Sequence, residues 1–192
     1  MMTLYFAPGA SSMAPYIALY EVGATFEAVP LSLKRKEMHE PAYLALNPEG
    51  KVPTLVIDGR PLTEVAAILF YLARSFPDAR LLPDSIEEQA QVISWMSFAA
   101  ATLHPARNKG SNRAKETFAL AERRLGRGEW AVGRYSIADI HLFRIFWRYC
   151  NSLQPPRAEF PALYAHYDRM MARDAVKRAI AAEAAVGYEL PA

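Results

Sequence analysis

The chain changes from mixed strand and helix patterns to purely helical patterns near residue 75, and this change constrains the fold more than any other feature. Before it, short β-rich runs alternate with helical periodicity; after it, each segment with a clear period is helical. The expected strands are 3–6, 26–29, 54–57 and 60–62, and the expected helices are 13–22, 65–74, 86–103, 113–125, 137–150, 161–173 and 174–183. We therefore expect a β-α-β unit, then a hairpin and a helix, then an all-helical part.

Glycine and proline set the connections in the first part. Pro8-Gly9 ends the first strand, and Gly23 ends the first helix. Asp58-Gly59 suits a two-residue hairpin loop, because both residue types tolerate a positive φ. The β-α-β order predicts a parallel strand pair with a right-handed crossover, and the hairpin adds antiparallel strands.

Two small domains fit this pattern. Residues 76–84 contain two prolines and no clean period, so we interpret them as a linker. This places an α/β domain at 1–75 and an all-helical domain at 85–192. The length of 192 residues allows one compact domain or two small ones. A hydrophobic content of 52% with 22% charged residues excludes an extended disordered chain.

Charge and cysteine content exclude several functional classes. Lys and Arg number 22 against 20 Asp and Glu, a net charge of +2, which is not the basic footprint of a nucleic-acid-binding protein. The single cysteine, Cys150, closes no intrachain disulfide and favours a reducing cytoplasm. The first residues lack a signal-peptide pattern, and the longest apolar run, 65–73, is too short to span a bilayer. The histidines show no metal-binding spacing, so we expect no metal and no membrane partner.

Two serines, Ser11 and Ser12, precede the first expected helix. A serine at this place most commonly caps the helix. Alternatively, one hydroxyl donates a hydrogen bond to a bound thiolate, whose negative charge the helix dipole also stabilises. The residues alone leave both roles open.

Two further segments are ambiguous in the same way. Pro53 stands directly before a strand, where a cis Val52–Pro53 bond would present the Val52 backbone to a ligand. The dipeptide alone favours trans, since only about 5–6% of such bonds are cis. Glu64 precedes the first N–H groups of a helix, and the two together complement the ammonium and carboxylate of an amino-acid end. An acid at this position also simply stabilises the helix dipole.

Other polar residues favour structural roles. Ser136 and Asp139 have the spacing of a capping box, at the start of a helix that is apolar on most faces. His104 ends an apolar helix, where a capping or core role is the commonest. The run Lys34-Arg35-Lys36 is typical of a solvated loop, or of a loop that receives an anion.

Taken in order, these segments resemble the cytosolic glutathione S-transferases of the bacterial beta-like type, over nearly the whole chain. Residues 4–15 (LYFAPGASSMAP) are similar to the family's opening strand and first helix, 47–53 (NPEGKVP) to its cis-proline segment, 62–64 (LTE) to the acidic half of its γ-glutamyl-binding motif, and 136–139 (SIAD) to its folding box. Leu103-His104-Pro105 is also similar to the beta-like members.

The resemblance implies a thioredoxin-like N-terminal domain, an all-helical C-terminal domain and a cytoplasmic homodimer. It implies glutathione as cosubstrate, no metal, and attack of the glutathione thiolate on small hydrophobic electrophiles in detoxification. By position, Val52 pairs with the cysteinyl backbone, a cis Pro53 sets that geometry, Glu64 binds the γ-glutamyl ammonium, Lys36 or Lys51 meets the glycyl carboxylate, and His104 lines the electrophile pocket.

Departures from the family pattern sharpen these expectations. The family usually has serine or threonine after the acidic residue, but here Val65 leaves only a backbone N–H, which predicts weaker glutathione binding. Beta-like members often carry a cysteine where Ser11 stands, so we expect a serine-type transferase. Ser12 is one rival, and Tyr5 is the other, because Tyr5-Phe6 resembles the strand-end tyrosine of tyrosine-type members.

Residues 108–112 form a segment that is short for a helical hairpin of this family, which we expect to open the electrophile pocket and alter the dimer face. Two alternative functions remain at this point. One is a catalytically weak or inactive binding and interaction protein, which Val65 motivates. The other is a glutathione-dependent isomerase or dehalogenase. The electrophile itself has no sequence signature, because hydrophobic pockets discriminate weakly.

Overall fold

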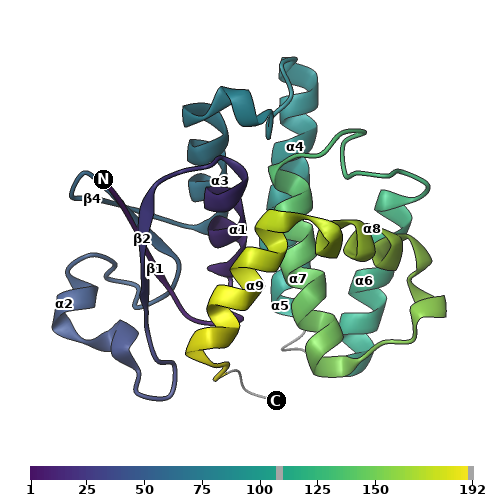
Figure 1. Ribbon diagram of the computed structural model, residues 1–192. Coiled ribbons are helices and arrows are strands. Elements are labelled where there is room, and N and C mark those ends of the chain that lie inside the picture. The colour runs from purple at the N-terminus through teal and green to yellow at the C-terminus, as the bar shows by residue number, and fades with distance from the viewer. Residues whose placement is uncertain (107–109, 190–192) are drawn as a thin grey trace. The chain divides into compact units, whose positions relative to one another are not determined.

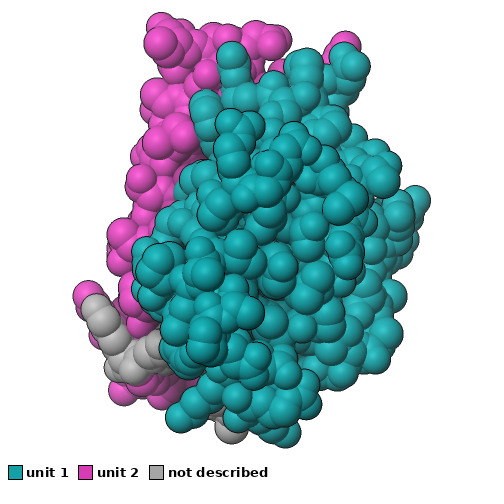
Figure 2. Space-filling view, turned by 90° about the vertical axis from the view of Figure 1, so that its left-hand side faces the viewer, with its two compact units in different colours: residues 1–79, 174–192 teal, residues 80–173 magenta. Residues whose placement is uncertain are grey.

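The computed structural model describes residues 1–106 and 110–189, and the chain divides into two compact units (Figures 1 and 2). The first unit combines residues 1–79 with the chain from Asp174 onward, and the second runs from Arg80 to Arg173. This division differs from the expected domains 1–75 and 85–192, because the last helix joins the first unit. Among the described helices, none has the length and apolar character needed to cross a bilayer.

The first unit contains a four-stranded mixed sheet. Its elements are β1 (Met2–Phe6), α1 (Met13–Glu21), β2 (Phe26–Pro30), η1 (Glu37–His39), α2 (Pro41–Leu44), β3 (Thr54–Ile57), β4 (Arg60–Thr63), α3 (Val65–Ser75), η2 (Pro77–Ala79) and α9 (Asp174–Val186). The strand order is β2-β1-β3-β4, with β1 parallel to β2 and antiparallel to β3, and β3 antiparallel to β4. The β-α-β and hairpin signals predict these strand directions, and the arrangement is the thioredoxin-like one that the resemblance implies.

Alternation along β1 assigns α1 and α2 to opposite faces of the sheet. Leu4 and Phe6 are buried, and the Phe6 ring lies 5.0 Å from the ring of Tyr16 on α1. Tyr5 points the other way, and its ring lies 5.6 Å from that of Tyr43 on α2. The two faces of one strand therefore separate the α1 side from the α2 side.

Helix α9 belongs to the first unit because it packs against α1 (Figure 1). The buried stripe of α9 follows helical spacing through Ala175, Val176, Ala179 and Glu183. Beside the stripe, the Arg178 guanidinium lies 4.1 Å from the centre of the Tyr20 ring on α1. These contacts join segments at opposite ends of the chain, so local sequence patterns do not reveal them.

The second unit is helical. It contains α4 (Ile86–Phe98), the π-helical turn η3 (Ala99–Leu103), α5 (His104–Ala106), α6 (Ser111–Leu125), α7 (Ile137–Leu153), η5 (Arg157–Glu159) and α8 (Pro161–Ala172). The helix expected to end at His104-Pro105 continues through α5. Pro105 lacks the N–H that an α-helical ladder needs, and the preceding turn adopts π-type bonding. The short segment expected at 108–112 lies in part outside the described residues.

Helix α7 begins with the capping box that its sequence predicts. The Ser136 hydroxyl accepts the Ala138 N–H at 3.3 Å, and Asp139 Oδ2 accepts the Ser136 N–H at 2.9 Å. Asp139 Oδ1 also accepts the Ala131 N–H at 2.8 Å and lies 3.0 Å from His166 Nε2. Ser136 and Asp139 are fully buried, so this end of the helix is satisfied from within the unit.

Candidate active site

The loop from Ala7 to Ser12 joins β1 to α1 and carries both candidate serines. The Ser12 hydroxyl donates to the Ala7 carbonyl and accepts the Ala7 N–H, each at 3.1 Å. Ser12 itself has helical backbone angles and makes no side-chain bond to the helix start, so the capping role typical of such serines is not seen. Instead Ser12 closes the loop on itself, and the Gly9 N–H donates to Glu183 Oε2 at 2.8 Å.

Ser11 faces the segment that carries Pro53. Its hydroxyl donates to the Val52 carbonyl at 2.9 Å, although the two residues are 41 positions apart. The Val52–Pro53 bond is cis, as the resemblance implies and the dipeptide alone does not. Both Ser11 and Val52 are partly exposed, so a ligand can reach this edge of the unit. The structure thus brings together a hydroxyl and a peptide that the sequence separates widely.

Tyr43 and Asn47 hold the cis-proline segment in place. Tyr43 Oη lies 2.8 Å from Thr54 Oγ1, and Asn47 Nδ2 donates to the Lys51 carbonyl at 2.8 Å. Burial raises the pKa of the Tyr43 phenol, so it stays a neutral hydrogen-bonding group. The Tyr5 ring packs on Tyr43, on the sheet face opposite α1. Tyr5 therefore packs against a residue that holds the cis-proline segment.

Glu64 occupies a strained position at the start of α3. Its φ of 68° lies in the region that residues other than glycine rarely adopt. Its side chain is exposed and caps no helix N–H group. The first N–H groups of any helix have no intrahelical acceptor, so Val65 and Ala66 present donors beside the Glu64 carboxylate. This end of α3 can hold an ammonium and a carboxylate together.

The two candidate lysines are exposed and differ in their surroundings. Lys51 forms an ion pair with Glu49 at 2.9 Å. The pKa of Lys51 is raised by the hydrogen bond and charge of Glu49 and, more weakly, by the charge of Glu64. Lys51 is therefore electrostatically coupled to the start of α3. Lys36 stands in a left-handed conformation at the start of η1.

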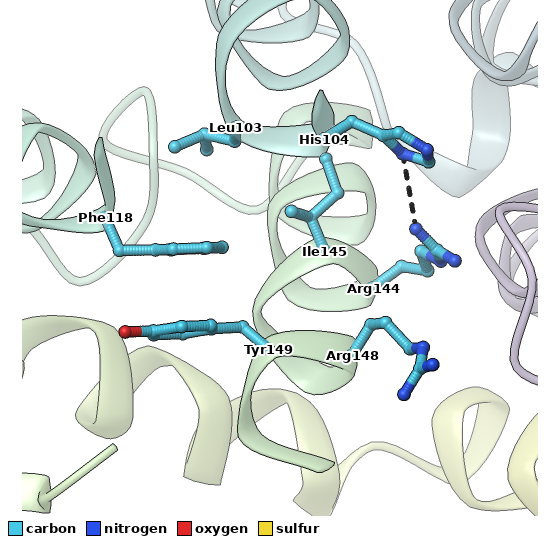
Figure 3. A pocket seen from close by; sticks show the side chains of 7 residues that line it. All are labelled: Leu103, His104, Phe118, Arg144, Ile145, Arg148 and Tyr149. Atoms are coloured by element: carbon cyan, nitrogen blue, oxygen red, sulfur yellow. Dashed lines mark hydrogen bonds between the residues drawn. The ribbon is translucent and has the colours of Figure 1, made fainter. Parts of the chain in front are cut away.

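His104 lies in the second unit and lines a cavity of about 40 Å³ there (Figure 3). The lining residues are Leu103, His104, Phe118, Arg144, Ile145, Arg148 and Tyr149. One side is aromatic, with the Phe118 and Tyr149 rings stacked at 4.1 Å. The other side is basic: Arg144 and Arg148 project from α7, and an Arg144 nitrogen lies 3.4 Å from His104 Nδ1. Sequence reasoning missed both arginines, because they stand in a helix whose pattern is otherwise that of a core.

Two other groups near these elements are unsuited to nucleophilic or acid–base work. Burial, followed by the charges of Arg144 and His104, lowers the pKa of His141 to about 3, so this histidine is neutral at physiological pH. Burial raises the pKa of the Cys150 thiol to about 11, which makes it a poor nucleophile. Within residues 1–106 and 110–189, no three His, Cys, Asp or Glu side chains gather in a way that could hold a metal ion.

A thioredoxin-like unit with a cis-proline segment, together with a helical unit, is the architecture that the resemblance implies. Residues 1–74 match the family "Glutathione S-transferase, N-terminal domain", and residues 66–174 match "Glutathione S-transferase, C-terminal domain". The chain is 35% identical over 200 residues to glutathione S-transferase GstA of Escherichia coli O157:H7, covering 95% of this chain and 98% of that protein. The chain belongs to the glutathione S-transferase family and is a transferase.

Solved structures agree with this assignment. A glutathione transferase from Methylococcus capsulatus superposes with a TM-score of 0.85 at 33% identity, covering 96% of this chain and all of that one (100%). A sphingomonad glutathione S-transferase complexed with glutathione superposes with a TM-score of 0.82 at 34% identity, covering 95% of this chain and 98% of that one. Glutathione is therefore the cosubstrate to test against the Ser11, Val52 and Glu64 geometry.

Proposed function

We propose that this protein joins the glutathione sulfur to small hydrophobic electrophiles, with the Ser11 hydroxyl stabilising the thiolate. The observation that carries the proposal is the 2.9 Å bond from the Ser11 hydroxyl to the Val52 carbonyl. The carbonyl and the N–H of Val52 are the groups expected to pair with the cysteinyl backbone of glutathione. A ligand whose cysteinyl N–H donates to the Val52 carbonyl displaces the Ser11 hydroxyl from it. The freed hydroxyl then lies beside the ligand's cysteinyl side chain, which carries the sulfur.

Binding in this proposal uses three parts of the first unit. The Val52 backbone pairs with the cysteinyl residue of glutathione. The Glu64 carboxylate binds the γ-glutamyl ammonium, and the first N–H groups of α3 bind the γ-glutamyl carboxylate. Lys51 or Lys36 meets the glycyl carboxylate. The strained backbone at Glu64 supports this assignment, since such strain gathers at ligand-binding sites.

Chemistry then requires a thiolate beside an electrophile. The glutathione thiol loses its proton to solvent, and the resulting thiolate accepts a hydrogen bond from Ser11 near the start of α1, where the helix dipole lowers the thiol pKa further. The sulfur attacks an electrophilic carbon, a C–S bond forms, and a leaving group departs with the bonding electrons. Binding energy from the rest of glutathione holds the reacting atoms together.

Ser11 is preferred to its two rivals on geometry. The Ser12 hydroxyl is fully buried and hydrogen-bonded to both the N–H and the carbonyl of Ala7, so these bonds within the loop already occupy it. Tyr5 packs against Tyr43 on the sheet face opposite α1. Ser11 is the one of the three that is both partly exposed and in contact with Val52.

The wider proposal follows the relatives that match over their whole length. We place the electrophile beside His104 in the second unit, and we propose a homodimer that acts in detoxification in the cytoplasm. The aromatic side of the His104 cavity, formed by Phe118 and Tyr149, favours apolar electrophiles. Val65 weakens glutathione binding without abolishing it, because its backbone N–H remains a donor.

Steady-state kinetics with an activated aryl halide test the proposal. Ser11→Ala should lower kcat/KM about 10–100-fold, because it removes a hydrogen bond to a charged sulfur. Tyr5→Phe, the matched control, should leave kcat/KM unchanged. Unchanged turnover in Ser11→Ala removes the role given to Ser11. Calorimetric titration separates the alternative function: absence of binding at millimolar glutathione identifies a non-catalytic interaction protein.

A further inference from the structure

We infer that Glu183, near the end of α9, is a positioning residue for the loop that carries Ser11. Glu183 Oε2 accepts the Gly9 N–H at 2.8 Å across 174 positions of sequence. Gly9 stands two residues before Ser11 in the loop. The inference rests on the proposed function of Ser11 and adds to it a residue at the opposite end of the chain.

The burial of Glu183 shows that its carboxyl group is there for more than helix packing. Its side chain is fully buried, at the end of a stripe whose other members, Ala175, Val176 and Ala179, are apolar. A carboxyl group in such a contact is costly unless it is hydrogen-bonded. An alanine or leucine would complete the stripe between α9 and α1 at lower cost. The hydrogen bond from the Gly9 N–H is one interaction that offsets this cost.

The bond holds the loop at Gly9, between the contacts of Ala10 and Ser12 with Ala7. Ser12 ties the end of the loop to Ala7, and the Ala10 N–H donates to the Ala7 carbonyl at 3.0 Å. Gly9 lies between these ties and has a φ of +73°, a conformation that glycine adopts at no steric cost. A fixed acceptor at Gly9 therefore sets the path of the chain into Ser11. Glu183 acts through Ser11 and has no need to touch the sulfur.

Steady-state kinetics on the full chain measure this role as a difference between kcat and KM. Glu183→Ala removes the acceptor, and kcat should fall about tenfold as the Ser11 hydroxyl loses its position. The KM for glutathione should change by less than about twofold, because Val52 and Glu64 anchor the ligand. Glu183→Gln keeps an oxygen that can accept the Gly9 N–H and should restore kcat to within about twofold. A kcat in Glu183→Gln as low as in Glu183→Ala overturns the inference.

Val176→Ala is the matched control for loosened packing. Val176 lies on the same buried stripe of α9, and its apolar side chain cannot accept a hydrogen bond from the loop. It should lower the melting temperature and leave kcat unchanged. A fall in kcat in Val176→Ala equal to that in Glu183→Ala shows that helix packing alone matters, and this overturns the inference.

A double-mutant cycle separates this inference from the proposed function. If Glu183 acts through Ser11, the loss caused by Glu183→Ala disappears in a Ser11→Ala background. An equal loss in both backgrounds overturns the positioning role. Failure of the proposed function has a different signature: Ser11→Ala alone then leaves turnover unchanged, whatever Glu183→Ala does.

Discussion

The starts of α7 and α3 solve the same problem in opposite ways. Each helix begins with N–H groups that have no acceptor inside the helix. At α7, Ser136 and Asp139 are fully buried and satisfy the helix start from within. At α3, Glu64 is exposed, holds a strained backbone and makes no capping bond.

The difference shows how a fold separates stability from binding. A helix start that the protein satisfies internally has nothing to offer a ligand, and it stabilises the unit that contains it. A helix start with an outward acid and uncommitted N–H groups is less stable alone, and it suits the ammonium and carboxylate of an amino acid. Both starts carry an acidic residue, so the presence of an acid does not distinguish them; its burial and bonds do.

The largest expected effect is at the α7 start. Asp139→Ala should lower the free energy of unfolding by about 3 kcal/mol or more, because it leaves a buried backbone donor, that of Ser136, and a half-buried one, that of Ala131, without their acceptor. Urea denaturation measures this change. Asp174→Ala, at the exposed start of α9, is the control and should cause no measurable loss. If Asp139→Ala costs no more than this control, the α7 start is not a stability element.

The next largest effect is at the α3 start, where one substitution should weaken glutathione binding and stabilise the fold. Glu64→Gly should weaken glutathione binding about 10–100-fold, because it removes the charge that holds the ammonium. The same change should raise the free energy of unfolding by about 1 kcal/mol, because glycine adopts φ 68° without strain. Titration calorimetry and urea denaturation give the two values.

Gln154→Gly is the control for relief of backbone strain. Gln154 has a φ of 45° at the end of α7 and is exposed. Its replacement by glycine should stabilise the protein in the same way and leave glutathione binding unchanged. A loss of stability in Glu64→Gly would contradict the view that strain at this residue is maintained for binding.

Local signals in the sequence were sufficient for most elements and for part of the site. The Asp58-Gly59 hairpin and the Ser136–Asp139 capping box follow from short-range rules, and the structure confirms both. The cis bond at Pro53 required the family resemblance, because the dipeptide alone favours trans.

Long-range contacts account for what the sequence could not predict. The placement of α9 in the first unit and the bond from Glu183 to Gly9 join opposite ends of the chain, so no periodicity reveals them. Arg144 and Arg148 lie one turn apart on α7, but the cavity that they line also needs His104, which is 40 positions before Arg144 in the chain. Ser12 has the sequence context of a helix cap, but its helical backbone directs the hydroxyl back to Ala7.

The smallest expected effect is at Val65, which follows Glu64 at the start of α3. This side chain is buried and apolar, so only its N–H can bind the γ-glutamyl carboxylate. Val65→Thr keeps the branched shape and adds a hydroxyl at the helix start. We expect it to tighten glutathione binding about tenfold, the value of one further hydrogen bond to a charged group.

Val65→Ala separates the hydroxyl from the loss of side-chain volume. It should leave the dissociation constant for glutathione unchanged and lower only the stability of the first unit, because a buried methyl contact is lost. Calorimetric titration of both variants decides the point. Equal dissociation constants for the threonine and alanine variants would mean that the backbone N–H alone satisfies the carboxylate. The α3 start would then already be complete for binding, as the α7 start is for stability.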